Sequence, residues 1–329
     1  MVMRKELMVG ISLLAGIIIG IALLGGVHSH ITAGETLITV QQENVSDNPT
    51  YSVLGKVSNN IVLDTPIPNP EEKVLVYQVI PSHYTRQDSI SLAQKFNIST
   101  TGKIKEVEEG SSIASEDGTK YVILHNSGSI EFTNSNRAHT VNPFDVPGNL
   151  PTDDEAIRIA TQFLTDRDLL PDDAICIGTE HGKIYQLGNN GNNTVVWEDI
   201  EVWYGRMLNG LKVKGSQLSV AVGGGGDIID YYSNWRNYEP YKEFPVKSPE
   251  QAFDELKTKG IPVDTNTSDK VSIKEVYLAY HTKAGAETEY YLEPVWVFEG
   301  DVIVDGKSSM TVTEHIPALT DDAVKSLSS

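Results

Sequence analysis

The alternation of hydrophobic and polar positions is clearest over residues 201–235. Three runs of β-branched and aromatic residues are separated there by Asn209-Gly210 and by four glycines at 223–226. Asn and Gly tolerate the positive φ angles that a two-residue type I′ turn requires, so the first break is typical of a β-hairpin. The pattern predicts a three-stranded antiparallel meander.

Two stretches change from the strand period to the helical period. Thr85 and Thr152 each begin a motif in which a carboxylate follows three residues later. The threonine hydroxyl can cap the helix, while the carboxylate lies at the positive end of the helix dipole. The spacing therefore predicts two amphipathic helices, over residues 83–96 and 153–165.

The two helical motifs correspond at a constant offset of 67 residues. The matched positions are Thr85 with Thr152, Asp88 with Glu155, Ile90 with Ile157, Leu92 with Ile159, Ala93 with Ala160 and Phe96 with Phe163. A fixed offset favours an internal repeat, although two unrelated amphipathic helices can share such spacing. Each helix would lay one apolar stripe on a sheet, which predicts an α+β fold of tandem units.

Further elements follow from local signals. Ser248-Pro249 and Gln251 form a helix start, and Gly260 ends that helix. Alternating segments predict strands at 73–80, 103–107, 120–125, 129–132 and from 271 to 314, with a turn at Asp305-Gly306. Pro294 lacks an N–H group, so its strand is expected to lie at an edge or to begin there.

The N-terminal stretch that begins at Leu7 and ends at Val27 is apolar except for Ser12. About 20 such residues are enough to cross a bilayer as a helix. Arg4 and Lys5 precede it, so the positive-inside rule places the N-terminus in the cytoplasm and the rest of the chain outside. We expect a retained single-pass anchor, with cleavage of a signal peptide and secretion as the alternative.

These signals predict a division of the chain into segments of different kinds. The expected segments are a membrane anchor at 1–29, a proline-containing stalk at 30–70, a first helix-plus-sheet unit at 71–140, a linker at 141–151, a second and larger unit at 152–319 and a tail at 320–329. Because residues 36–40 and 61–63 are β-like runs, the segment at 30–70 could instead be a loosely packed first pair of strands. The expected fold class is therefore α+β, with an antiparallel sheet and one packed helix in each unit, preceded by one transmembrane helix.

Composition narrows the classes of partner. The 329 residues carry a net charge of -19, which disfavours nucleic acid because a phosphate backbone would be repelled. A soluble, self-repelling surface explains this charge better than an acidic ligand-binding site. The single cysteine, Cys176, excludes an intrachain disulfide, and its apolar neighbours predict that it is buried.

Catalytic and metal-binding motifs were sought, and none is predicted. Neither H-E-x-x-H nor G-x-S-x-G occurs. Histidines 181 and 315 each follow a glutamate directly, and adjacent residues on a strand point to opposite faces. The glycines at 223–226 are followed by Asp227 rather than by Lys-Ser/Thr, which favours a turn over a phosphate loop. We predict no cofactor, no metal and no enzymatic activity.

Two kinds of surface site remain. Aromatic residues of the meander are expected mainly in the core or in cross-strand pairs, but some could face outward with an arginine as a protein-binding face. The candidates for that face are Trp203, Arg206, Tyr231 and Trp235. Four N-x-S/T sequons could carry glycans on an exported chain, at Asn44, Asn97, Asn192 and Asn266.

A family resemblance rests on turn glycines and core positions of the meander. The residues that carry it are Arg206, Asn209-Gly210, Val213, Gly215, Leu218, Val220, Val222, Gly226, Ile228 and Trp235. Over roughly residues 71–319 the chain resembles PepSY-like proteins. Related modules occur in the propeptides of thermolysin-type metalloproteases and in YycH/YycI-type extracytoplasmic regulators of sensor kinases. The resemblance implies a PepSY/cystatin-like fold, but no protease domain follows in this chain.

The leading functional expectation is a non-enzymatic, membrane-anchored extracytoplasmic module. It would bind another protein and so regulate a membrane sensor or an exported protease. Two alternatives stay open. Acidity, the stalk and the sequons also suit a structural component of the cell surface, and an enzyme of unrecognised type is the other.

Overall fold

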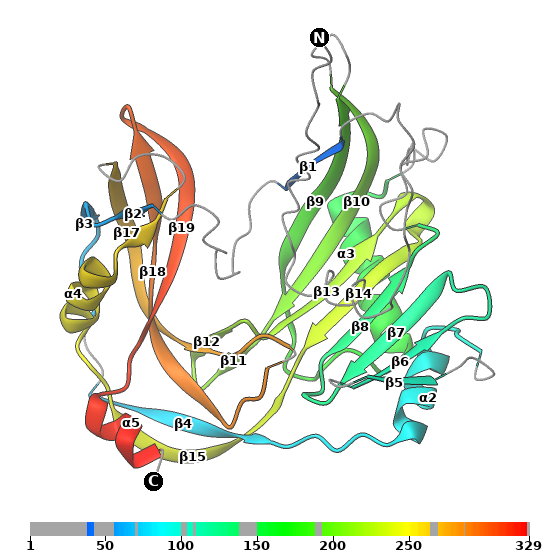
Figure 1. The fold of residues 1–329 in the computed structure, drawn as a ribbon, viewed down its shortest axis with the longest axis horizontal. Helices are drawn as coiled ribbons and strands as arrows, with labels where there is room; N and C mark the ends of the chain where they lie inside the picture. The colour runs from blue at the N-terminus through cyan, green and yellow to red at the C-terminus, as the bar shows by residue number, and fades with distance from the viewer. Residues whose placement is uncertain are drawn as a thin grey trace, which may run out of the picture. The chain divides into compact units, whose positions relative to one another are not determined.

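The computed structural model describes most of the chain in two compact units (Figure 1). The described residues are 38–42, 56–69, 72–99, 104–107, 110–137, 150–187, 193–263, 269–285 and 287–327. The first unit contains Ser82–Gly205 and Gln217–Trp235, together with β1. The second contains Arg206–Ser216 and the chain from Arg236 onward, together with the described residues between 56 and 81. The two units thus cut across the boundaries expected at 71–140 and 152–319.

A nine-stranded sheet forms the first unit, and every neighbouring pair in it is antiparallel. In spatial order its strands are β1 (Ile38–Gln42), β9 (Ile175–Leu187), β10 (Asn193–Gly205), β13 (Gln217–Val222), β14 (Ile228–Asn234), β8 (Ile130–Asn134), β7 (Lys120–His125), β6 (Gly110–Ala114) and β5 (Ile104–Val107). Two helices accompany it, α2 (Arg86–Lys95) and α3 (Asp153–Asp166). The α+β class is therefore confirmed.

The first unit is built from two segments of the same kind. In the chain, α2 is followed by β5, β6, β7 and β8, and α3 is followed by β9, β10, β13 and β14. Each set of four strands is consecutive in the sheet, and the last strands, β8 and β14, pair with each other. Both helices pack into one apolar cluster with the sheet. The correspondence between the helices thus extends to the four strands after each of them.

Local signals place both helices where the pattern predicts them. The Thr85 side chain accepts from the Asp88 N–H, and the Asp88 carboxylate accepts from the Thr85 N–H, which forms a capping box. Thr152 caps α3 in the same position. The cross-strand partners Val202 of β10 and Val220 of β13 lie fully buried in the cluster that includes both helices.

The Asn209-Gly210 turn is confirmed, but it does not join neighbouring strands of the first unit's sheet. It connects β11 (Met207–Leu208) to β12 (Leu211–Lys214), with φ angles of 49° and 79° at the two turn residues. This hairpin belongs to the second unit, where β12 runs parallel to β17 (Lys270–His281). The expected meander is instead completed by β10, β13 and β14, which are direct neighbours.

The second unit contains an eight-stranded sheet, in which β11, β12, β17, β18, β4 and β15 follow one another, while β19 pairs with β18 and β3 with β17. The remaining bounds are β3 (Ile61–Leu63), β4 (Lys73–Ile80), β15 (Asn237–Pro245), β17 (Lys270–His281), β18 (Tyr291–Val304) and β19 (Lys307–Pro317). A separate pair is formed by β2 (Val57–Ser58) and β16 (Ile261–Pro262). Its helices are α4 (Pro249–Lys259) and α5 (Asp321–Leu327).

Two predictions in the second unit are confirmed. A capping box formed by Ser248 and Gln251 begins α4, Pro249 occupies its first turn, and Gly260 ends it with a φ of 73°. Residues 305 and 306 form the turn between β18 and β19, with φ angles of 50° and 77°. Both features depend on a few consecutive residues, which explains why the sequence alone locates them.

Two predictions about the edges of the fold are wrong, and a third holds only in its alternative form. Residues 61–63 of the expected stalk form the strand β3, whose Ile61 is buried in the second unit's core, so the interpretation as strands fits this part of the segment better than a stalk. The expected tail holds α5, where Ala323 is buried against the β15 residue Phe244 and its neighbours. Pro294 lies within β18 rather than at a sheet edge. On one side of β18, pairing with β4 ends at Leu292 and pairing with β19 begins at Val295. Pro294 lies between these two pairings, so its missing N–H interrupts neither set of hydrogen bonds.

The predicted membrane span lies outside the described residues. Among the helices that the structure describes, none is long and apolar enough to cross a bilayer. The anchor therefore stays a prediction from the sequence.

Candidate functional site

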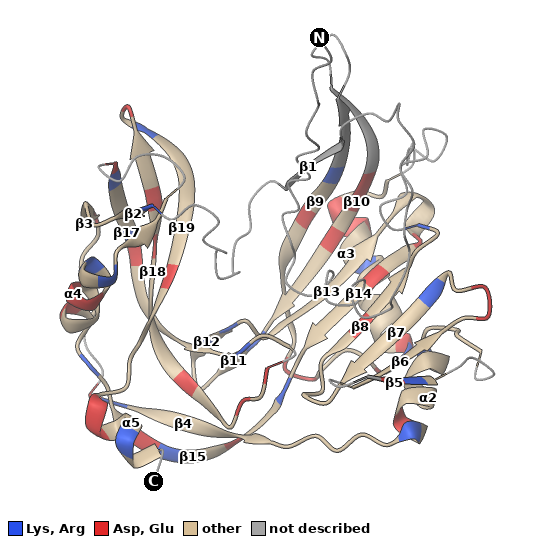
Figure 2. Ribbon diagram, in the orientation of Figure 1, with Lys and Arg blue, Asp and Glu red and all other residues tan. Residues whose placement is uncertain are grey.

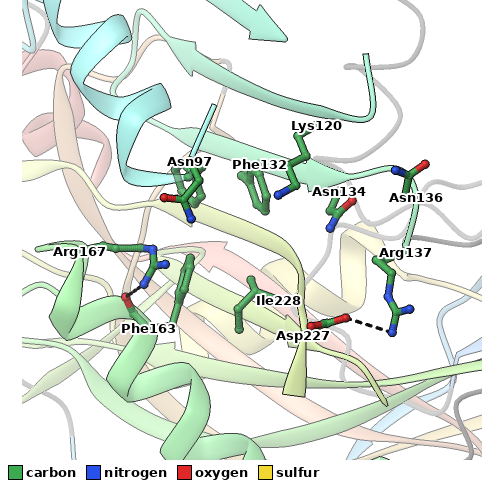
Figure 3. A pocket seen from close by; sticks show the side chains of 11 residues that line it. Asn97, Lys120, Phe132, Asn134, Asn136, Arg137, Phe163, Arg167, Asp227 and Ile228 are labelled. Carbon is green, nitrogen blue, oxygen red and sulfur yellow. Dashed lines mark hydrogen bonds and ion pairs between the residues drawn. The ribbon is translucent and has the colours of Figure 1, made fainter. Parts of the chain in front are cut away.

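A cavity of about 420 Å³ lies in the first unit, where the two helix-plus-four-strand segments meet (Figure 3). We call it the junction pocket. Its eleven lining residues are Phe96, Asn97, Lys120, Phe132, Asn134, Asn136, Arg137, Phe163, Arg167, Asp227 and Ile228. They come from the ends of α2 and α3, from β7 and β8, and from the start of β14.

Aromatic rings form the apolar wall of the junction pocket. Phe96 stacks on Phe132 with ring centroids 4.4 Å apart, and it lies 6.1 Å from Phe163. Phe96 and Phe163 are the last matched pair of the 67-residue correspondence. The pocket thus brings together equivalent residues from the two segments.

Three cations line the junction pocket, against a single carboxylate. Arg137 pairs with Asp227 at 3.2 Å and donates to the Gly224 carbonyl. The Arg167 guanidinium lies over the Phe163 ring, 4.4 Å from its centroid. Among the described residues, no acceptor oxygen contacts the Lys120 ammonium. In a chain with a net charge of -19, the pocket is a local excess of positive charge.

Two lining residues of the junction pocket, Asn97 and Arg167, are held in place at the ends of helices. Asn97 has a φ of 57° and follows α2, with its N–H bonded to the Gln94 carbonyl, in the left-handed conformation that often ends a helix. Arg167 follows α3, and its Nε donates to the Lys95 carbonyl at 2.9 Å. This hydrogen bond joins the C-terminal ends of α2 and α3.

Amide groups complete the lining. The Asn134 Oδ1 atom is buried and has no hydrogen-bond partner. A buried acceptor without a partner is unfavourable by itself, so a donor brought by a ligand would be stabilised there. Figure 3 shows Phe132, Phe163 and Ile228 in the middle of the wall, with the Arg137–Asp227 pair on one side.

Acidic residues also occur along the strands of the first unit's sheet (Figure 2). Asp199 and Glu201 of β10 alternate with Ile200 and Val202, which belong to the cluster that includes both helices, so the two carboxylates lie on the opposite face of the sheet. Burial, together with the nearby charges of Asp230 and Glu180, raises the pKa of Asp199 to about 8. Burial also raises the pKa of Glu201 to about 8, with Asp199 as the next cause. For Asp230, burial raises the pKa to about 7. These groups keep their protons at a pH where ordinary carboxyls are ionised.

The predicted protein-binding face is not formed as expected. Tyr231 is only 3% exposed and belongs to the core, while Arg206 is 9% exposed and donates to the Arg236 carbonyl. Trp203 and Trp235 are half-buried in the first unit, whereas Arg206 belongs to the second. The alternative interpretation, in which meander aromatics fill the core, fits Tyr231 because its position alternates toward the helices.

The sequons and the cysteine have different outcomes. Asn97 is exposed and also lines the junction pocket. The sequons at 44, 192 and 266 lie outside the described residues. Cys176 is exposed, so the prediction that it is buried is wrong. Its neighbours on β9, Ile175 and Ile177, are exposed as well, which shows that apolar neighbours in sequence do not guarantee burial.

Histidines of the second unit approach each other without forming a metal centre. The rings of His281 and His315 have centroids 4.7 Å apart. Burial, helped by His281 and Lys214, lowers the pKa of His315 to about 3, so this ring is neutral. Across the described part of the chain, no group of three His, Cys, Asp or Glu side chains is arranged to hold a metal ion.

A buried ion pair organises the loop between β17 and β18. Arg236 and Glu289 pair at 3.1 Å, with side chains 3% and 2% exposed. The same guanidinium donates to several groups of that loop, namely the Thr282 hydroxyl and the carbonyls of Lys283, Ala284 and Glu287. The pair is thus part of the second unit's framework.

Comparison with known proteins gives little guidance. No protein-family model matches the chain, and no curated protein matches it. Among solved structures, it is similar to the crystal structure of an uncharacterized protein from Eubacterium rectale. The identity is 13%, the match covers 79% of this chain and 88% of that one, and the TM-score is 0.45. This likeness is too distant to indicate a function.

Sequence reasoning missed the junction pocket. Its lining residues are spread from 96 to 228, and no local motif connects them. The one available signal was the pairing of Phe96 with Phe163 in the 67-residue correspondence. Equivalent aromatic residues at the ends of repeated helices are brought together when the repeats pack about a shared centre.

Proposed function

We propose that this chain is a non-enzymatic binding protein that holds a small ligand in the junction pocket. The observation that carries the proposal is the composition of that pocket, which combines an aromatic wall with three cations at the meeting point of two similar segments. Most ligand sites are largely apolar cavities of about 300–1,000 Å³ with a few well-placed polar groups. A pocket of about 420 Å³ falls within that range.

The lining favours binding over catalysis. It consists of Phe, Ile, Asn, Lys, Arg and Asp side chains. The described part of the lining holds no Ser, Cys, Thr or His side chain that could form a pair of nucleophile and base, and its single carboxylate, Asp227, is paired with Arg137. The polar groups here are suited to orienting a ligand.

The cellular setting is part of the same proposal. An N-terminal anchor at residues 7–27 would hold the pocket outside the cytoplasm, where a ligand from the surroundings could reach it. Occupancy of the pocket would then control an interaction with another protein, such as a membrane sensor or an exported protease. The sequence resemblance to PepSY-like regulators supports this setting.

A ligand screen with the full chain in detergent tests the proposal. A ligand that binds only the folded state raises the melting temperature with its concentration. We expect such a ligand among small metabolites, and we expect Ile228→Trp, which fills the pocket, to abolish the shift. Ile177→Trp is the matched control, because Ile177 lies in the same unit and is 62% exposed.

Two results would contradict the proposal. An equal shift in the Ile228→Trp variant would place the ligand elsewhere. Chemical conversion of the ligand by the pure protein, followed by mass spectrometry, would show that the chain is an enzyme.

A further inference from the structure

We infer that the junction pocket recognises a carboxylate attached to an apolar group. The inference rests on the proposed binding function and names the class of ligand. Free apolar acids carry this chemistry, and so does the C-terminal residue of a peptide with an apolar side chain. Four properties of the pocket support this class of ligand.

The first property is an available cation. The Lys120 ammonium has no acceptor among the described residues, and its side chain is only half-buried. Figure 3 shows this amine directed into the pocket, beside Phe132. Charge-assisted hydrogen bonds between an ammonium and a carboxylate are about twice as strong as neutral ones. An anionic ligand group therefore gains most by approaching Lys120.

The second property is a fixed guanidinium. Stacking on Phe163 and the hydrogen bond to the Lys95 carbonyl hold Arg167 in one orientation. A planar guanidinium that is already ordered loses little conformational freedom when it binds an anion. Arg137 differs, because Asp227 already neutralises it. The charge left for a ligand comes from Lys120 and Arg167.

The third property limits the charge of the ligand. Phe96 and Arg167 lie at the C-terminal ends of α2 and α3, where the helix dipoles are negative. The Asp227 carboxylate also lines the pocket. A phosphate near neutral pH carries between one and two negative charges and is typically bound at helix N-termini or by several donors. A carboxylate, with a single charge, is the better match.

The fourth property is the apolar middle of the pocket. Phe132, Phe163 and Ile228 lie between Arg167 on one side and the Arg137–Asp227 pair on the other. Burial of an apolar group against such rings contributes roughly 25 cal/mol per Å². The buried Asn134 Oδ1 can in addition accept from an N–H group next to the carboxylate. A peptide C-terminus supplies that donor, whereas a simple acid does not.

Four probes test the inference by isothermal titration of the full chain in detergent. They are N-acetyl-phenylalanine, its amide, phenylacetate and phenyl phosphate. We expect N-acetyl-phenylalanine to bind and its neutral amide to bind at least about tenfold more weakly, since a hydrogen bond to a charged group contributes about 1.5–3 kcal/mol. Lys120→Gln should weaken the acid by a similar factor. Lys105→Gln, the same change at an exposed site of this unit, should have no effect.

The two acids distinguish the sources of the ligand. Tighter binding of N-acetyl-phenylalanine than of phenylacetate, lost in Asn134→Leu, identifies a peptide C-terminus. Equal binding of both acids identifies a free apolar acid. Either result supports the inference.

Other results overturn it. Equal binding of the acid and the amide, tighter binding of phenyl phosphate, no binding of either acid, or full affinity in Lys120→Gln would show that a carboxylate is not what the pocket recognises. If a ligand from the metabolite screen binds the parent chain but not the Ile228→Trp variant, the proposed binding function stands even when the ligand is not an apolar carboxylate. If that ligand still binds the Ile228→Trp variant, both the binding function of the junction pocket and the inferred class of ligand are wrong.

Discussion

Asp199 and Glu201 are alternate residues on one strand and point to the same face of the first unit's sheet. Their pKa values of about 8 mean that the fold holds them protonated near neutral pH. The Ser219 hydroxyl bonds to the Glu201 carboxylate and opposes that shift, but burial outweighs it. Single carboxyl groups in this sheet therefore couple folding to pH.

We expect the free energy of unfolding to fall as pH rises from about 4 to about 8. Unfolded carboxyls release their protons near pH 4, so between these values the folded state binds more protons than the unfolded state. Below about pH 4 both states are protonated, and this contribution is fully present. Urea unfolding across this range measures it.

Substitution of single carboxyl groups shows which of them causes this pH dependence of the unfolding free energy. Asp199→Asn should reduce the loss of stability on the alkaline side, because the amide has no proton to release. Asp172→Asn, at an exposed position of the same unit, should leave the profile as it is. An unchanged slope in Asp199→Asn would mean that this carboxyl ionises normally in the folded protein.

Two glycines with the same backbone conformation offer a second test at this scale. Gly210 and Gly215 both have a φ of 79°. A Cβ on Gly210 would meet nothing within 4 Å, whereas on Gly215 it would lie 2.6 Å from the Thr282 carbonyl oxygen. We expect Gly210→Ala to destabilise by about 1–2 kcal/mol through φ alone. Gly215→Ala should cost more, because the backbone must also move.

Urea unfolding of both variants gives the comparison. An equal loss of unfolding free energy in the two variants would mean that the backbone near Thr282 shifts without strain. A Gly210→Ala variant as stable as the parent would contradict the left-handed turn itself.

Among the elements, the helices were predictable and the strand partners were not. The predicted helix at 153–165 matches α3 because its cap and apolar stripe are local signals. By contrast, β10 is followed in the chain by β11 but pairs with β13. Alternation shows which face of a strand is buried and leaves open which strand lies beside it. β15 was missed because most of its residues are polar and exposed.

The loop between β17 and β18 depends on one arginine. Removing a single partner of a buried ion pair typically destabilises by about 3–5 kcal/mol, because the other charge stays buried. We therefore expect Arg236→Met to destabilise the second unit by that amount. Calorimetric unfolding of the full chain measures the loss.

A double variant separates the pair from the loop contacts. Glu289→Gln added to Arg236→Met should recover part of the loss, since no uncompensated carboxylate remains. If the double variant is as unstable as the sum of the two single ones, the carbonyl contacts of Arg236 carry the effect instead of the ion pair.

For the whole molecule, the sequence predicted the helices and strands better than the limits of the two units. Tandem helix-and-sheet segments were expected as separate units, but both lie in one sheet. The segment 206–216 leaves the first unit and joins the second, and such a detour has no signature in composition. The junction pocket shares this limit, because Lys120 and Ile228 come together only when the two segments pair.

The anchor predicted at residues 7–27 is tested on the whole chain. An arginine at the centre of a membrane helix disfavours insertion by about 2.5–3.5 kcal/mol. We expect the parent chain to stay in the membrane fraction after an alkaline wash and Ile18→Arg to be released or degraded. Ile31→Arg, which lies beyond the apolar run, should behave as the parent. Release of the parent chain would indicate cleavage and secretion.

The interleaved order of the two units has a consequence for the way the chain is made. β4 leaves the ribosome early, yet its neighbours β15 and β18 begin at residues 237 and 291. Every strand of the first unit has been delivered by Asn234. The first unit can therefore fold while the backbone N–H and C=O groups of β4 still lack their partner strands. An unpaired strand of this kind in a nascent chain is prone to pair with a wrong strand. Folding of the second unit should therefore depend on how fast the strands from β15 onward are delivered.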